Sequence, residues 1–445
     1  MFKTIINAWK VKDIRTKMLY TLLLIVVYRL GSFIPAPSVN GEKLGELIAS
    51  YDFLSFLNLF SGGSLNNFSL FAMGISPYIT ASIILQLLTI AFPSLEKLSK
   101  EEDGREKIEK ITRIVGVVLA LIQSVSIVVG LNSANGDLIK KITIFGTSGF
   151  GTFMNGFMPY VITGICCTAG TAFLMWMGER ITEKGIGNGV SILIFASIVS
   201  SVPNVVINLI NGTFHIIPIA YKWWYGIVVI LVVLILTVGI VTVEKAVRRI
   251  PVQYAKRVVG RKLYGGQSTH IPLKANANGV MPLIFAMTIL QVPGMIGQFW
   301  PKGKFYTFVS TYLSPATTNI AGIIIYYVLY AIMIVGFAYF YSSITFNPVE
   351  ISKNLQQNGG FIPGIRPGRP TSDYLQKKCS RLTMFGALFL MIIAIIPTLL
   401  LKVLNITVLS AFGPTSILIM ISVSIEIADQ LDSLMIMRNH KGFLN

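Results

Sequence analysis

The sequence predicts an all-α membrane protein that crosses a bilayer ten times, in two inverted, pseudo-symmetric halves of five spans, with a re-entrant segment after the first span. Three observations predict this fold: an apolar composition, ten long apolar stretches, and a weak repeat between the halves. Of the 445 residues, 53% are hydrophobic and only 13% are charged, and the mean hydropathy is +0.69. Soluble domains carry about 25% charged residues, so lipid is the main solvent of this chain.

The apolar stretches are each long enough to cross about 30 Å of hydrocarbon, which takes about 20 helical residues. The expected spans are 16–33, 72–92, 114–131, 158–177, 190–209, 225–243, 280–297, 320–342, 384–401 and 408–427. The first span follows a basic stretch, as in a signal peptide, but no small-residue cleavage pattern comes after it. We therefore expect a retained helix there.

The basic residues predict the orientation, because Lys and Arg next to spans are held on the cytoplasmic side. With a cytoplasmic N-terminus, roughly 29 Lys and Arg lie on that side against about 7 on the other. Both termini, the tails 1–15 and 438–445, are thus expected in the cytoplasm. The net charge of +18 is concentrated mainly in the loops 244–278 and 343–381, and such a face attracts anionic partners.

A weak internal repeat relates the two halves, 16–210 and 211–437. The second and seventh spans open with GISPYI (74–79) and GVMPLI (279–284), and the fifth and tenth share SILI (191–194 and 416–419). The fourth and ninth match at the same internal spacing, through Gly170, Phe173, Leu174 and Met175 and through Gly386, Phe389, Leu390 and Met391. Five spans per half make the repeats inverted, which predicts a midplane transport site between them. Alternatively, the motifs GISPYI and GVMPLI mark two ordinary helix starts with Pro in the first turn.

The segment 51–70 is apolar but is interrupted by Ser61, Gly62, Gly63 and Ser64, and it is too short to span. Non-helical backbone at membrane depth is tolerated only inside protein or against a watery cavity. A re-entrant fold would therefore imply a central cavity. An amphipathic helix on the membrane surface is the alternative.

The chain lacks the residues of an enzyme or an ion-coupled carrier. Ionisable residues are almost absent from the spans, since Arg29 is near an outer end and Glu426, Asp429 and Asp432 are near a cytoplasmic end, where interfacial anchoring explains them. The three histidines and three cysteines form no catalytic, disulfide or metal spacing, and no phosphate-binding loop occurs. We expect no catalytic residue, no metal and no cofactor.

Several longer words resemble those of bacterial SecY. They are YRLGSFIP (28–35), FSGG (60–63), GIGNG (185–189), YAKR (254–257), QSTHIPLK (267–274), FNP (346–348) and GFIPGIRPG (360–368). The similarity extends from about residue 16 to residue 437. The resemblance implies a protein-conducting channel in a bacterial inner membrane, not an enzyme, through which unfolded secretory polypeptides and their signal peptides pass.

In such a channel, the interrupted segment is a plug and six aliphatic side chains form a ring at mid-membrane. The resemblance implies a plug at about 57–70, with Leu57, Phe60, Ser61, Gly62, Gly63, Ser64 and Asn67. It implies a ring of Ile75, Ile79, Val190, Ile194, Ile284 and Ile419. Val190 departs from the isoleucine that is frequent in the family, so the ring is expected to be slightly wider there. Buried aliphatic side chains of an ordinary core are the alternative reading.

The resemblance also implies a lateral gate between the second and seventh spans, for which Thr80 and Val292 are the candidates. It implies partners: SecE and SecG in the membrane, the ribosome, and SecA, which hydrolyses the ATP. The candidate docking residues for SecA and the ribosome are Arg248, Arg249, Lys256, Arg257, Arg261, Lys262 and Arg366. Setting membrane topology is the alternative role of these basic residues.

Two other classes of protein share part of this pattern. A secondary solute carrier has inverted repeats, but it needs ionisable residues in its spans. A membrane scaffold that recruits ribosomes or RNA through its basic loops would bind them without conducting anything.

Overall fold

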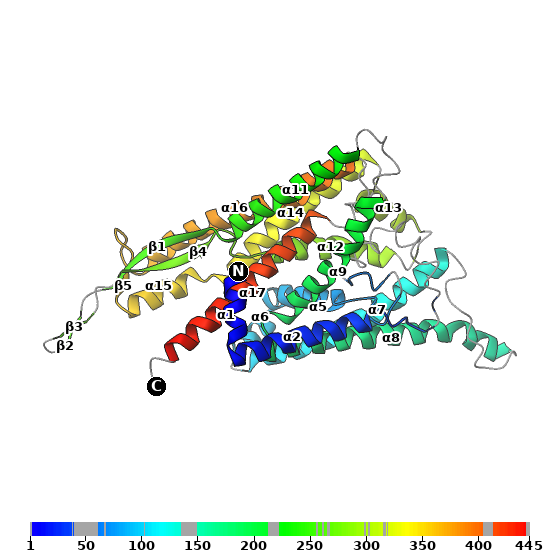
Figure 1. The fold of residues 1–445 in the computed structure, drawn as a ribbon, viewed down its shortest axis with the longest axis horizontal. Helices are drawn as coiled ribbons and strands as arrows, with labels where there is room; N and C mark the ends of the chain where they lie inside the picture. The colour runs from blue at the N-terminus through cyan, green and yellow to red at the C-terminus, as the bar shows by residue number, and fades with distance from the viewer. Residues whose placement is uncertain are drawn as a thin grey trace. The chain divides into compact units, whose positions relative to one another are not determined.

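The computed structural model describes most of the chain (Figure 1). The described residues are 2–37, 39, 61–65, 68–101, 103–134, 149–211, 222–254, 257–259, 262–264, 268–297, 300, 303–314, 317, 319–403 and 413–441.

Ten of the helices coincide one for one with the ten predicted spans. They are α2 (Lys12–Gly31), α5 (Ser76–Ala91), α7 (Gly104–Ala134), α8 (Gly149–Lys184), α9 (Gly189–Asn211), α11 (Lys222–Glu244), α12 (Met281–Gly297), α14 (Ile320–Thr345), α16 (Arg369–Val403) and α17 (Pro414–Lys441). The shorter helices are α1 (Phe2–Lys10), α6 (Pro93–Lys100), α13 (Lys304–Tyr312) and α15 (Pro348–Gln357). The prediction of a helical membrane protein is confirmed.

By length and composition, the helices of the described residues differ in how clearly each could cross a membrane. Four helices are long and apolar enough to cross a membrane alone. A fifth span results if α5 and α6, bent by 107° at Phe92, are taken together. Three shorter apolar helices lie at Gly189–Pro203, Ile230–Glu244 and Met281–Gly297. Pro93 ends α5, because proline removes a backbone donor and disfavours a helical residue before it.

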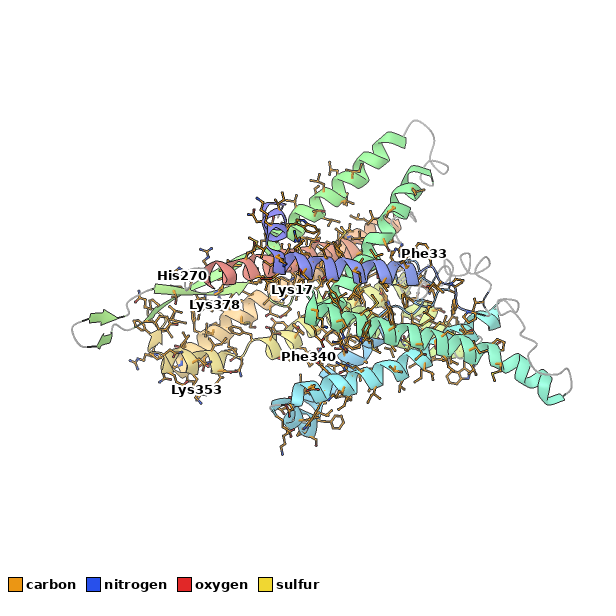
Figure 2. All side chains as sticks on the ribbon, turned by 60° about the horizontal axis from the view of Figure 1, so that its bottom comes forward. Lys17, Phe33, His270, Phe340, Lys353 and Lys378 are labelled. Atoms are coloured by element: carbon orange, nitrogen blue, oxygen red, sulfur yellow. The ribbon has the colours of Figure 1, made fainter. Side chains whose placement is uncertain are left out.

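The chain divides into two compact units. The first unit comprises residues 1–222, 288–327 and 404–445, and the second comprises 223–287 and 328–403. In the first unit, α7 packs on α5 and α8, while α9 packs on α8 and α17. Helix α1 lies on α2 and α17. Figure 2 shows Lys17 near the N-terminal end of α2 and Phe33 just past its other end.

Within the described residues, the second unit contains five short strands that the sequence analysis did not predict. Strand β1 (Val247–Tyr254) pairs antiparallel with β4 (Ser268–Lys274) and with β5 (Gly360–Phe361), and β2 (Arg257–Val259) pairs with β3 (Lys262–Tyr264). Ile250 and Val252 alternate with exposed residues along β1 and pack with Leu375 of α16. Helix α16 begins at Arg369, well before the predicted span at 384–401. The described residues of the two basic loops thus include strands and helices.

The predicted repeat is visible in the local geometry of α5 and α12. Gly74 and Gly279 precede these helices with φ of 56° and 57°, a region that glycine adopts without the steric cost of a Cβ. The amide nitrogens of Ile79 and Ile284 then each donate to a carbonyl four residues earlier, at 3.1 Å in both cases. The hydrogen bond is that of any α-helix, so the matching positive φ of the two glycines is the feature that supports the repeat.

The fourth and ninth spans carry the same repeat at Gly170 and Gly386. A Cβ at Gly170 would overlap the carbonyl oxygen of Leu70, and a Cβ at Gly386 would lie 3.2 Å from the carbonyl oxygen of Ala275. Leu70 lies four residues before Gly74, and Ala275 lies four residues before Gly279. Gly170 therefore lies directly against the backbone that leads into α5, and Gly386 lies against the backbone that leads into α12, each within its own unit.

We predict that Gly170→Ala destabilises the protein, because the new methyl group displaces the Leu70 backbone. The expected loss is about 1–3 kcal/mol, the usual effect of overpacking, seen as a lower melting temperature of the purified complex in detergent. Gly239→Ala in α11 is the matched control, because a Cβ there meets nothing within 4 Å. Equal melting temperatures for the two variants would contradict the close contact.

Candidate functional site: a buried non-helical segment and its anchors

Residues 61–65 and 68–75 form a series of turns that leads into α5. Ser61, Leu65 and Ser69 are completely buried, and Phe68 is 1% exposed. These residues form no helix, so the surface-helix alternative does not apply to them, and the re-entrant interpretation is supported. Leu57, Phe60 and Asn67, which the sequence analysis also assigned to the plug, lie outside the described residues.

The C-terminal part of this segment is held by the strand-like stretch after α2. The amide of Ala36 donates to the carbonyl of Phe68 at 2.8 Å, and the amide of Leu70 donates to the carbonyl of Ile34 at 2.9 Å. Phe68 has a φ of 40°, a conformation that side chains rarely adopt. Burial of its ring and these backbone bonds hold it in that conformation.

The N-terminal part is held by side chains of α2 and α9. Tyr28 Oη lies 3.1 Å from the Ser61 carbonyl oxygen and 2.6 Å from Ser197 Oγ. Arg29 Nη1 donates to the Gly62 carbonyl oxygen at 2.9 Å, and its guanidinium lies 5.4 Å from the centre of the Phe33 ring. The sequence analysis explained Arg29 by interfacial anchoring alone. The structure gives it a partner inside the protein.

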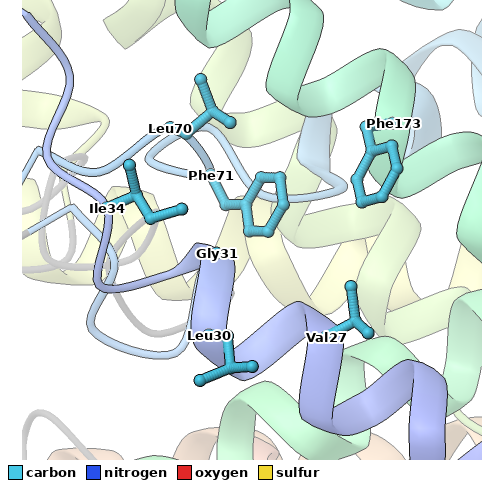
Figure 3. Close-up of a pocket in the computed structure, with 7 residues that line it drawn as sticks. All are labelled: Val27, Leu30, Gly31, Ile34, Leu70, Phe71 and Phe173. Atoms are coloured by element: carbon cyan, nitrogen blue, oxygen red, sulfur yellow. The ribbon is translucent and has the colours of Figure 1, made fainter.

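Stacked aromatic rings join the segment to α2 and α8. Phe71 stacks on Tyr28 and on Phe173, with ring centres 5.9 Å and 6.0 Å apart, and Phe173 stacks on Trp176. An apolar pocket of about 330 Å³ lies beside Phe71, and Figure 3 shows the residues that line it. The cavity is lined by Val27, Leu30, Gly31, Ile34, Leu70, Phe71 and Phe173.

The six candidate ring residues lie at the beginnings of four helices. Ile75 precedes α5; Ile79, Val190, Ile194, Ile284 and Ile419 lie in the first two turns of α5, α9, α12 and α17. Val190 is half-buried and the other five are buried. Five of the residues belong to the first unit and Ile284 to the second. Their assignment to a pore ring stays a prediction.

The two candidate gate residues lie in the first unit. Thr80 is buried in α5, where its hydroxyl donates to the Ser76 carbonyl oxygen of its own helix, and Val292 is half-buried in α12. Near Val292, the hydroxyl of Ser126 in α7 donates to the Met295 carbonyl oxygen at 3.3 Å. Because α7 packs on α5, this weak bond links the α5–α7 pair to α12.

The basic candidates belong to the second unit, and part of this set lies on well-defined turns and strands. Arg248 and Arg249 are exposed on β1. Arg366 is exposed on a turn. The Thr371 hydroxyl donates to the Arg366 carbonyl oxygen at 2.8 Å, and the Ser352 hydroxyl donates to the Gly368 carbonyl oxygen at 2.7 Å. Figure 2 shows His270, Lys353 and Lys378 around the same strands and helices.

The remaining basic candidates are only partly described. Arg257 is the first residue of β2, and Lys262 is the first residue of β3. Lys256 and Arg261 fall outside the described residues.

In the part of the chain that is described, no group of three or more His, Cys, Asp or Glu side chains could hold a metal ion. Tyr28, Ser197 and Ser200 are the site residues that the sequence analysis missed. The word YRLGSFIP contains Tyr28, but no sequence signal pairs it with a serine of another span.

Comparison with known proteins gives the family. A family model of SecY matches residues 69–428. The chain belongs to the SecY family. Among curated SecY proteins, the protein translocase subunit SecY of Halalkalibacterium halodurans is 42% identical over 454 residues, covering 100% of both chains. Those of Bacillus subtilis and Streptomyces coelicolor are 40% and 43% identical, also over the full length of both chains.

Solved structures of SecY relatives share the fold. A protein-conducting channel superposes with a TM-score of 0.66 at 18% identity, covering 94% of this chain and 91% of that one. Sec61 from a canine ribosome-channel complex of the endoplasmic reticulum gives a TM-score of 0.59 at 17% identity, with the same coverage.

Proposed function

We propose that this chain is the channel-forming subunit of a protein translocase, and that unfolded polypeptides cross or enter a bacterial inner membrane through it. The observation that carries the proposal is the largely buried, non-helical backbone of residues 61–65 and 68–75 inside a helical membrane protein, in a chain whose relatives are protein translocase subunits. Such backbone requires protein or a watery cavity around it. A plug that fills a closed pore meets this requirement.

The pore is sealed by the six aliphatic residues defined above. Branched aliphatic side chains can close around a passing chain and exclude water, which blocks ions without any specific contact to the passenger. The shared position of Ile79 and Ile284 supports this assignment, since each lies three residues after the first residue of a repeat-related helix. Ile194 and Ile419 likewise occupy matching places in α9 and α17.

The lateral gate opens between α5 and α12, near Thr80 and Val292. An apolar segment of about 20 residues is more stable in hydrocarbon than in a wet pore. An opening seam therefore releases signal peptides and membrane segments into lipid by partition, and the channel needs no catalysis.

The driving force comes from partners at the basic cytoplasmic loops. Exposed arginines bind the phosphates of ribosomal RNA and the carboxylates of proteins, so Arg248, Arg249 and Arg366 are suited to the ribosome and to the ATPase SecA. A related Sec61 occurs in a ribosome-channel complex. SecE and SecG complete the membrane complex, and both termini of this chain lie in the cytoplasm.

The two rival classes make different predictions. A secondary carrier would concentrate a small solute in vesicles without a protein partner, whereas this chain should not. A scaffold would bind ribosomes but would show no ion conductance when the segment 57–67 is removed.

We predict that deletion of residues 57–67 makes the reconstituted complex leak ions. The flux through proteoliposomes should rise about tenfold or more, because the aliphatic ring alone is left to exclude water. An ion-sensitive dye inside the vesicles measures the flux, and empty vesicles give the background. A deletion variant that assembles normally and stays as tight as the wild type would refute the channel.

We predict that Arg366→Glu reduces SecA-driven transport of a secretory protein into proteoliposomes by about tenfold or more, because a reversed charge at a docking contact repels the partner. Lys353→Glu is the matched control, since Lys353 is an exposed basic residue of the neighbouring helix α15. Transport that is equally fast with both variants would remove Arg366 from the docking surface.

A further inference from the structure

Two carbonyl oxygens at the start of the buried segment accept hydrogen bonds from side chains outside it. The Ser61 carbonyl oxygen is reached by Tyr28 Oη at 3.1 Å, and within the segment by Ser64 Oγ at 2.7 Å. The Gly62 carbonyl oxygen is reached by Arg29 Nη1 at 2.9 Å and by Ser200 Oγ at 3.4 Å. The donors come from α2 and α9.

Tyr28 has one hydroxyl hydrogen and lies between Ser61 O and Ser197 Oγ. The Ser197 hydroxyl also lies 2.8 Å from the Leu193 carbonyl oxygen of its own helix. Tyr28 therefore donates to Ser61 when Ser197 donates to Tyr28, and it donates to Ser197 when Ser197 donates to Leu193. Tyr28 is 1% exposed, so its hydroxyl relies on these protein partners and not on bulk water.

Steric fit adds a second, independent observation at Gly62. This residue has a φ of 64°, and a Cβ there would lie 2.9 Å from Ser200 Oγ and 3.0 Å from Ser197 Cα. Gly63 has a φ of 83°, yet a Cβ there meets nothing within 4 Å. Of these two glycines, only Gly62 thus lies directly against the backbone of α9.

We propose that Tyr28, Arg29, Ser197 and Ser200 form a latch that holds the start of the segment, residues 61–64, in the closed channel. The inference rests on the proposed function and adds the residues that set its opening threshold. The latch acts through backbone carbonyls, so it holds the segment independently of the side chains that the segment carries. When the segment moves away, the carbonyls and the latch side chains are hydrated by the water that enters the pore.

The latch residues are positioning residues, since none of them needs to touch the passing polypeptide. Their strength therefore controls how often the empty channel opens and how readily a weak signal sequence opens it. A weakened latch leaks ions and accepts defective signal sequences. A residue that only stabilises the fold would lower the melting temperature without either effect.

The direct test is ion flux through the purified, reconstituted complex with no substrate present. Tyr28→Phe removes one buried hydroxyl and should raise the flux about three- to tenfold, the equivalent of one net hydrogen bond. Arg29→Met removes a charged donor and should raise it about tenfold or more. Both variants should also increase transport of a substrate with a defective signal sequence, which a loss of fold stability alone would not do.

Matched controls separate the latch from general loosening of α2 and α9. Tyr20→Phe changes a half-buried tyrosine of the same helix α2. Ser201→Ala removes a hydroxyl that bonds the Ile198 carbonyl of its own helix at 2.7 Å. Ser200→Ala removes one that bonds the Ser197 carbonyl of its own helix at 2.7 Å and shares its hydrogen with the Gly62 carbonyl oxygen at 3.4 Å. We expect flux at the wild-type level for Tyr20→Phe and Ser201→Ala and increased flux for Ser200→Ala.

A glycine pair tests the same contact without changing the donors. Gly62→Ala and Gly63→Ala both place a Cβ on a backbone with positive φ, but only the first pushes against α9. Gly62→Ala should give the larger flux. A double variant, Tyr28→Phe with Ser197→Ala, should add little to Tyr28→Phe alone, since both substitutions disrupt one linked pair.

The outcomes distinguish this inference from the proposed function. Wild-type flux in Tyr28→Phe and Arg29→Met, together with a leaking deletion of 57–67, would overturn the latch and leave the channel intact. Tight vesicles from the deletion variant as well would overturn the channel and the latch together.

Discussion

The structure depends on one constraint of the bilayer: backbone polar groups at membrane depth have no water to bond and must find partners inside the protein. The helices meet this requirement with their own hydrogen bonds. The described turns at 61–65 and 68–75 do so only in part, and further carbonyl and amide groups of these turns bond to α2, α9 and the stretch 34–36. The elements around the segment are therefore also its hydrogen-bonding partners.

The need for close backbone contact explains why glycine occupies two positions of the repeat. Gly170 and Gly386 each allow the backbone that leads into α5 or α12 to lie directly against a neighbouring helix. Close backbone contact of this kind is frequent where membrane helices pack, because small residues remove the steric barrier. Ile79 and Ile284 then occupy equivalent places one turn into their helices, so a single local geometry positions two candidate ring residues.

Hydropathy predicted the spans because each one needs about 20 apolar residues, and this requirement is local in sequence. The Gly and Pro words predicted the repeat for the same reason, since a positive φ at Gly74 and Gly279 selects glycine directly. The strands of the two basic loops were missed because their stability comes from tertiary contacts, such as Ile250 with Leu375. Tyr28 and Ser197 were missed because their bond joins two distant spans. No periodicity in either span indicates such a pair.

The central claim is that the six aliphatic residues surround the path of the polypeptide. A single cysteine placed in turn at positions 75, 79, 190, 194, 284 and 419, with the native cysteines replaced, can be crosslinked to a secretory chain stalled during transport. The account predicts crosslinks at all six positions, and none at Val238, an exposed apolar residue of α11. A stalled chain that crosslinks at Val238, or at none of the six, would contradict it.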